Sequence, residues 1–172
     1  ALSLTYPNWS GNIPLSNGTG QTLTITAYDK AGNGVTSSTY TFDVDLDSPS
    51  ITVNTPTAPR RTNLASPVVS TYTVTDNGPS GTATVLVTRI GGTEIAAADQ
   101  TWSRVDDAWT ITIQPATLGS LGLASGSSYV VTTTATDAAG NTSTANFSII
   151  VDTTKPTVTI SNPENNATIN KL

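Results

Sequence analysis

The sequence predicts an all-β protein made of repeated β-sandwiches, and four observations support this. Charged residues are only 11% of the 172 residues, whereas hydrophobic residues are 36%. Runs such as Thr132-Thr133-Thr134 lie among valines and isoleucines, and β-branched residues of this kind favour strands. No segment shows helical periodicity over ten residues, although residues 115–123 allow one short helical turn. The fourth observation is an internal repeat, described below.

Six segments in the central part of the chain have the composition of strands bounded by turn residues. They are Ile51–Asn54, Val68–Thr75, Thr82–Ile90, Trp109–Ile113, Tyr129–Asp137 and Thr144–Val151. We expect the last two to form an antiparallel hairpin, because Gly140 and Asn141 between them can adopt the positive φ angles that a tight turn demands.

A repeat of about 107 residues runs through the chain. The Asp-x-Ala-Gly-Asn run at 29–33 returns at 137–141, and the segment that begins at Trp9 resembles the one that begins at Trp109. This period matches the size of an immunoglobulin-like sandwich. We therefore expect three parts, which are the C-terminal half of one Ig-like repeat (1–47), a complete repeat (48–154) and the first strand of a following repeat (155–172).

Composition excludes several classes of function. The chain has no cysteine, methionine or histidine, which removes thiol and imidazole nucleophiles, histidine bases and the common zinc sites, so we do not expect an enzyme. The net charge of −5 argues against a nucleic-acid partner. No apolar run is long enough to span a membrane. A β-rich chain without cysteine favours an extracellular or bacterial cell-surface location.

Acidic residues are expected to gather at one end of the complete repeat. In an immunoglobulin-like topology, the entering linker, the turn after the second strand and the last hairpin lie at the same end. These segments carry Asp45 and Asp47, Asp76, and Asp137 with Asn141, respectively. Crowded carboxylates repel one another unless a cation lies between them, and calcium accepts six to eight oxygen ligands in irregular geometry. The sequence thus makes calcium a candidate cofactor.

Further candidate ligands lie at the neighbouring junctions. Asp29 and Asn33 would serve the junction before this repeat, and Asp152 the junction after it. The alternative is that all these residues only form turns, because aspartate and asparagine cap their own backbone and no EF-hand spacing is present. The residues alone leave both interpretations open.

A second cluster combines aromatic and acidic residues. Asp106 and Asp107 lie between Trp102 and Trp109, an arrangement that a glycosidase or lectin could use for sugar stacking. The more ordinary interpretation, which we favour, places the tryptophans in the core and the aspartates in a hairpin turn.

The Asp-x-Ala-Gly-Asn turns and the Val-Asp-Thr-Thr-Lys-Pro-Thr-Val linker at 151–158 resemble the bacterial Ig-like repeats of giant surface adhesins and biofilm-associated proteins. The resemblance covers nearly the whole chain, and the linker is its most specific part. It implies a long rod of domains that holds a terminal adhesive domain away from the cell, with calcium at the junctions. The first linker departs from the pattern, since Leu46 and Asp47 replace the two threonines.

The function that we expect is a structural stalk or spacer in a secreted or cell-surface bacterial adhesin, stiffened by calcium between domains. Its partners would be neighbouring Ig-like repeats or like subunits, with a host or matrix glycan or protein contacted through other domains. The alternatives are a filament subunit completed by a strand from a neighbour, and an accessory carbohydrate-binding module.

Overall fold

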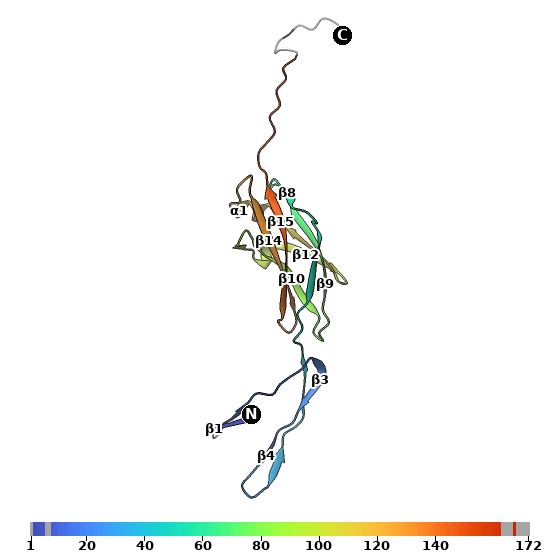
Figure 1. Cartoon of the computed structure of the whole chain (residues 1–172), viewed down its shortest axis with the longest axis vertical. Helices are drawn as coiled ribbons and strands as arrows, with labels where there is room; N and C mark the ends of the chain where they lie inside the picture. The colour runs from blue at the N-terminus through green and yellow to red at the C-terminus, as the bar shows by residue number, and fades with distance from the viewer. Residues whose placement is uncertain (1, 6–7, 163–166, 168–172) are drawn as a thin grey trace.

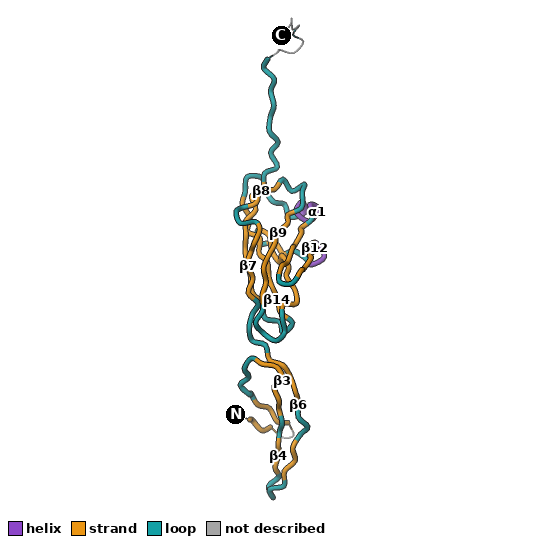
Figure 2. Tube along the Cα trace, turned by 90° about the vertical axis from the view of Figure 1, so that its right-hand side faces the viewer, coloured by secondary structure: helices purple, strands orange, loops and turns teal. Residues whose placement is uncertain are grey.

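The computed structural model describes residues 2–5, 8–162 and 167, and for residues 2–11 it describes the backbone only. The expected third-repeat strand at 155–172 therefore lies partly outside the described residues. Residues 50–151 form a β-sandwich, and the strands of residues 2–44 lie beyond one end of it, so that the molecule is elongated (Figures 1 and 2).

The sandwich has two sheets, which confirms the predicted all-β fold class. The first has five strands in the order β11-β10-β14-β15-β8, and the second has four in the order β12-β13-β9-β7. Their bounds are β7 (Ser50–Thr55), β8 (Arg60–Thr62), β9 (Val68–Thr75), β10 (Thr82–Ile90), β11 (Thr93–Glu94), β12 (Gln100–Val105), β13 (Ala108–Ile113), β14 (Ser128–Asp137) and β15 (Thr142–Val151).

Most neighbours in these sheets are antiparallel, as in a hairpin-connected sandwich. The exception is β8, which pairs with β15 in parallel. Two short helical segments complete the sandwich, a 3₁₀ turn η1 (Ala97–Asp99) and a helix α1 (Pro115–Ser120), the latter within the segment where a helical turn was expected. In the part of the chain that the structure describes, no helix has the length and hydropathy of a membrane span.

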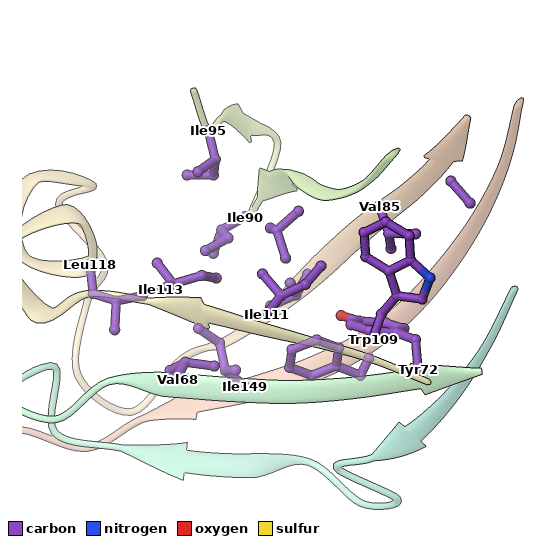
Figure 3. Packing of buried hydrophobic residues seen from close by; sticks show 14 of the residues in the cluster. Val68, Tyr72, Val85, Ile90, Ile95, Trp109, Ile111, Ile113, Leu118 and Ile149 are labelled. Carbon is purple, nitrogen blue, oxygen red and sulfur yellow. The ribbon is translucent and has the colours of Figure 1, made fainter. Parts of the chain in front are cut away.

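Alternating side chains of the two sheets point inward and form one core (Figure 3). Trp109 and Tyr72 are its largest members, and both are almost fully buried. The Tyr72 hydroxyl is satisfied inside the core by Ser70 Oγ at 2.9 Å and Thr133 Oγ1 at 2.6 Å. Burial raises the pKa of Tyr72 above its ordinary value, because the charged phenolate would lose water. The Tyr72 hydroxyl thus has one partner from each sheet, whereas Trp109 Nε1 is buried in the same core without a hydrogen-bond partner among the described residues.

The N-terminal segment contains three separate strand pairs. The pairs are β1 (Leu2–Thr5) with β2 (Asn8–Gly11), β3 (Gly18–Leu23) with β6 (Tyr40–Val44), and β4 (Thr26–Tyr28) with β5 (Gly34–Thr36). Between Ile13 and Leu46 the side chains are largely exposed, including many large apolar ones.

The packing of the core predicts how substitutions in β15 change the stability of the sandwich. Ile149 is fully buried, whereas its neighbour Ile150 points to the other side of the sheet and is half-buried. Ile149→Ala should lower the free energy of unfolding by about 2 to 5 kcal/mol, because the cavity cannot close completely. Ile150→Ala is the matched control and should cost about 1 kcal/mol or less. Urea denaturation measures both, and equal losses would contradict the assignment of the inner face.

Candidate functional site at the sandwich entrance

Three carboxylates meet where the chain enters the sandwich. Asp45 lies in the linker between β6 and β7, Asp76 follows β9, and Asp137 ends β14. Each offers one oxygen, and these oxygens all lie within 4.8 Å of one another. Asp137 is buried, while Asp45 and Asp76 are half-buried. Three segments far apart in sequence therefore place negative charge at one point.

The turn between β14 and β15 positions Asp137. The Asp137 carboxylate accepts hydrogen bonds from the backbone N–H of Asn141 at 2.8 Å and from Asn141 Nδ2 at 2.8 Å. Gly140 lies between them with φ of +96°, a conformation that favours glycine over residues with a Cβ atom. The Asp-x-Ala-Gly-Asn motif is thus a turn in which the aspartate receives its charge-stabilising donors from the asparagine.

Asn141 also reaches the linker. Its Nδ2 donates to the backbone carbonyl of Asp45 at 3.0 Å, and the neighbouring Ser143 hydroxyl donates to the backbone carbonyl of Pro49. These contacts attach the entering linker to the last hairpin.

The loop after β9 holds the Asp45 side chain. Ser80 donates to the Asp45 carboxylate from its backbone N–H at 3.1 Å and from its hydroxyl. These hydrogen bonds keep the pKa of Asp45 below its ordinary value, because they stabilise the charged form. Gly78 in the same loop has no side chain, and a Cβ atom there would overlap the Asp45 carboxylate. Asp45 therefore lies in a notch that this loop shapes.

Asp76 has an unsatisfied oxygen. Its Oδ1 accepts from the Gly78 backbone N–H at 2.9 Å, but its Oδ2 is buried and has no hydrogen-bond partner among the residues that the structure describes. Among the described residues, the ion pair found is Arg89 with Glu94, away from this cluster, so no basic side chain neutralises the three aspartates there. A buried carboxylate oxygen without a partner is costly.

The remaining predicted ligands lie elsewhere. Asp47 is exposed and contributes its backbone N–H, which donates to Asp45 Oδ1 at 3.1 Å, while its carboxylate is not in the cluster. Asp29 and Asn33 form a turn in the N-terminal segment. The hydrogen bond from the Asn33 side chain is the main reason why the pKa of Asp29 lies below its ordinary value. Asp152 follows β15, at the end of the strand away from the β14–β15 turn, and accepts from the Thr154 backbone N–H at 3.2 Å.

The aromatic cluster differs from its expected place in one respect. Trp109 is buried as predicted, but Trp102 is 54% exposed, because it lies on the edge strand β12. The two rings have centroids 5.2 Å apart, and the Arg104 guanidinium lies 5.0 Å from the centre of the Trp109 ring. Asp106 and Asp107 form the two-residue turn between β12 and β13, in line with the hairpin interpretation.

The hydrogen bonds of Asn141 generate a prediction. Asn141→Ala should lower the free energy of unfolding of the sandwich by about 1 to 3 kcal/mol, since the carboxylate of the buried Asp137 and the Asp45 carbonyl each lose the Asn141 side-chain donor. Asn146→Ala, an exposed asparagine on β15, is the matched control and should change it by less than about 0.5 kcal/mol. Denaturation in urea with a chelator present compares the two without any metal contribution. Similar small effects would show that the linker does not depend on Asn141.

Comparisons with known proteins identify a longer relative by sequence and fold neighbours among solved structures. No family model matches the chain. Chitinase A1 of Niallia circulans is 36% identical over 146 residues, which are 83% of this chain and 19% of the chitinase, so the chain spans about a fifth of that relative's length.

Among solved structures, the fibronectin(III)-like modules of Clostridium thermocellum CbhA align with a TM-score of 0.50 and 15% identity, over 86% of this chain and 70% of theirs. The SrpA adhesin of Streptococcus sanguinis, in its R347E mutant, aligns with a TM-score of 0.42 and 18% identity, over 63% of this chain and 59% of that chain. The first alignment places the sandwich among fibronectin-III-like and Ig-like folds.

Proposed function

We propose that this chain is a non-catalytic spacer segment of a secreted or surface protein, in which calcium stiffens the junction between residues 1–47 and the sandwich. The observation that carries the proposal is the meeting of Asp45, Asp76 and Asp137 within 4.8 Å. Each comes from a different segment, and one of them comes from the linker itself. A cation bound by all three would fix the linker to the end of the sandwich.

The donor set suits calcium. Carboxylate and carbonyl oxygens are the ligands that this ion prefers, and it tolerates irregular coordination. The buried Asp76 Oδ2 has no partner in the described part of the chain and would gain one from a cation. Asp45, Asp76 and Asp137 would hold the ion, and Asn141 would orient two of them. The chain has neither histidine nor cysteine, so a site for zinc of the usual kind has no ligands here.

The extracellular setting is supported by composition and by the relative. A chain without cysteine keeps the same covalent structure in an oxidising environment. The relative is named as a chitinase, and this chain corresponds to about a fifth of its length, which fits an accessory module better than a catalytic domain. An adhesin and an extracellular polysaccharide-degrading protein could both use such a spacer.

Calcium should raise the melting temperature of the chelator-treated protein. Binding to the folded state alone stabilises it by about 2.7 kcal/mol at a free concentration of 100 times Kd. Asp76→Asn should abolish most of this gain. Without calcium the same variant should melt at an equal or higher temperature, because a repulsive buried charge is removed.

Asp107→Asn, in the exposed β12–β13 turn, is the control and should keep the full calcium response. Calorimetry with and without calcium measures all three proteins. If exhaustive chelation leaves the melting temperature and the scattering-derived dimensions of the protein unchanged, the calcium junction is wrong.

A second candidate function rests on Trp102. Its exposed ring leans on the buried Trp109, so it is held in place before any ligand arrives. A fixed aromatic surface costs little conformational entropy on binding and can stack against the apolar face of a sugar ring. The relative named as a chitinase makes a polysaccharide the ligand to test first.

If Trp102 binds polysaccharide, Trp102→Ala should weaken retention on insoluble chitin by about tenfold, equivalent to about 1.4 kcal/mol. Tyr28→Ala removes another exposed aromatic ring, far from β12 in the chain, and should leave retention unchanged. Depletion assays with the chain and both variants decide the matter. Absence of binding by the unmodified chain, or equal binding by the Trp102 variant, removes this candidate.

A further inference from the structure

The first hairpin of the N-terminal segment repeats a hairpin of the sandwich in the same register. Leu4 pairs with Trp9 just as Arg104 pairs with Trp109, and the other three residue pairs of β1–β2 also have counterparts in β12–β13. All four counterparts lie one hundred positions later in the sequence. The agreement is one of strand pairing and therefore goes beyond similarity of sequence.

The next strands agree in the same way. Strands β3 and β4 correspond to β14, and β5 and β6 correspond to β15. Leu23 pairs with Tyr40 as Val131 pairs with Phe147. Residues 2–44 thus contain counterparts of the last four strands of the sandwich, in the same order.

The turns of the two copies are also alike. The Asn33 backbone N–H and Nδ2 donate to the Asp29 carboxylate at 2.8 and 2.7 Å, and the corresponding distances in the sandwich are both 2.8 Å. Gly32 has φ of +90° where Gly140 has +96°. The local sequence therefore builds this turn whether or not a sandwich surrounds it.

The two copies differ in what covers them. In the sandwich, β13, β14 and β15 pair on their other sides with β9, β10 and β8. Within the described residues, β2, β3, β4 and β6 have no such neighbours.

The exposed fractions of the side chains follow from this difference. Tyr40 is 63% exposed, whereas its counterpart Phe147 is 8% exposed, and Phe42 is half-buried where Ile149 is fully buried. The apolar side of the β3–β6 hairpin is therefore more exposed than the matching side of the sandwich.

We propose that residues 2–44 are the last four strands of a second sandwich, and that five strands of the β7–β11 type, from a further stretch of the same polypeptide, cover their open face. In the sandwich, β11 runs into β12 through only the short turn η1, so such strands would join β1 directly. A second copy of this chain is a poorer source. Its own β9 and β10 already bury Tyr72, Val85 and Val87, and it would have to unfold to donate them. None of the calcium-junction residues Asp45, Asp76 and Asp137 lies within residues 2–44.

The test uses the chain's own sequence as the missing part. Residues 48–100 are duplicated and placed ahead of Ala1, because Thr101 is the counterpart of Ala1 in the repeat. In this extended chain, amide hydrogen exchange in β3 to β6 should become roughly a hundredfold slower than in the 172-residue chain. Unchanged exchange in these strands would overturn the proposal.

Point substitutions provide a sharper comparison. Phe42→Asp introduces a charge on the face to be covered, and Thr41→Asp, at the adjacent exposed position, is the matched control. In the extended chain Phe42→Asp should abolish the slowed exchange, whereas Thr41→Asp should preserve it. In the 172-residue chain neither change should shift the melting temperature of the sandwich. Equal behaviour of the two variants in the extended chain would contradict an inward-facing Phe42.

Sedimentation velocity of the unmodified chain gives a readout that does not depend on folding of the extended chain. We expect a monomer at micromolar concentration. A dimer that Phe42→Asp dissociates would overturn the proposal and assign the face to a second copy. Calcium plays no part in these measurements, which are made with a chelator, so their failure leaves the calcium proposal untouched.

Discussion

The hydrogen bonds between Asp137 and Asn141 are the interaction on which the arrangement of this end of the molecule depends. They set the turn that joins β14 to β15, the two longest strands of the five-stranded sheet. The same Asn141 side chain donates to the Asp45 carbonyl and so ties the linker to that turn. Asn141 therefore contacts both the turn that closes the β14–β15 hairpin and the linker that enters the sandwich.

The turn also creates an electrostatic problem. Burial of Asp137 removes water from a carboxylate, and the Asn141 donors replace part of that water. Asp76 lies beside it with an oxygen that has no donor. Two hydrogen bonds from Ser80 to the adjacent Asp45 carboxylate keep the pKa of Asp45 below its ordinary value. The proposed cation would supply the partner that this Asp76 oxygen lacks among the described residues.

The sequence predicted the long strands and the edge strand β7 well, but it did not predict the edge strands β8, β11 and β12. Residues 68–75 and 82–90 alternate apolar and polar side chains or run as β-branched stretches, and their predicted bounds match β9 and β10. Strand β12 was not predicted, because its inward side holds Trp102 and polar residues at a partly open sheet edge. Strand β8 has only three residues, two of them arginines, and its pairing with β15 leaves no periodic signal.

For the carboxylate cluster, the expected topology of the sandwich was more informative than any sequence motif. The ends of strands that neighbour one another in a sandwich can be inferred from order alone, and this logic led to Asp45, Asp76 and Asp137. The role of Ser80 could not be inferred, because a serine in a loop has no pattern that distinguishes a donor from a surface residue. The exposed carboxylate of Asp47 shows the same limit, since two aspartates in one linker look equivalent until the backbone direction is known.

The strongest argument for a sheet that covers the β3–β6 hairpin is the alternation of apolar and polar residues in β6. The exposure of its side chains is the weaker argument. Tyr40, Phe42 and Val44 alternate with Thr41 and Asp43, which is the signature of a strand with one buried face. A two-stranded ribbon in water is only marginally stable, and it gains no stability from keeping its apolar side chains on one face. An apolar face stabilises the fold only when a second sheet packs against it, as the sheet that contains β13 and β9 packs against β15 in the complete copy. The packing of the β14–β15 hairpin thus accounts for the alternating sequence of the β3–β6 hairpin.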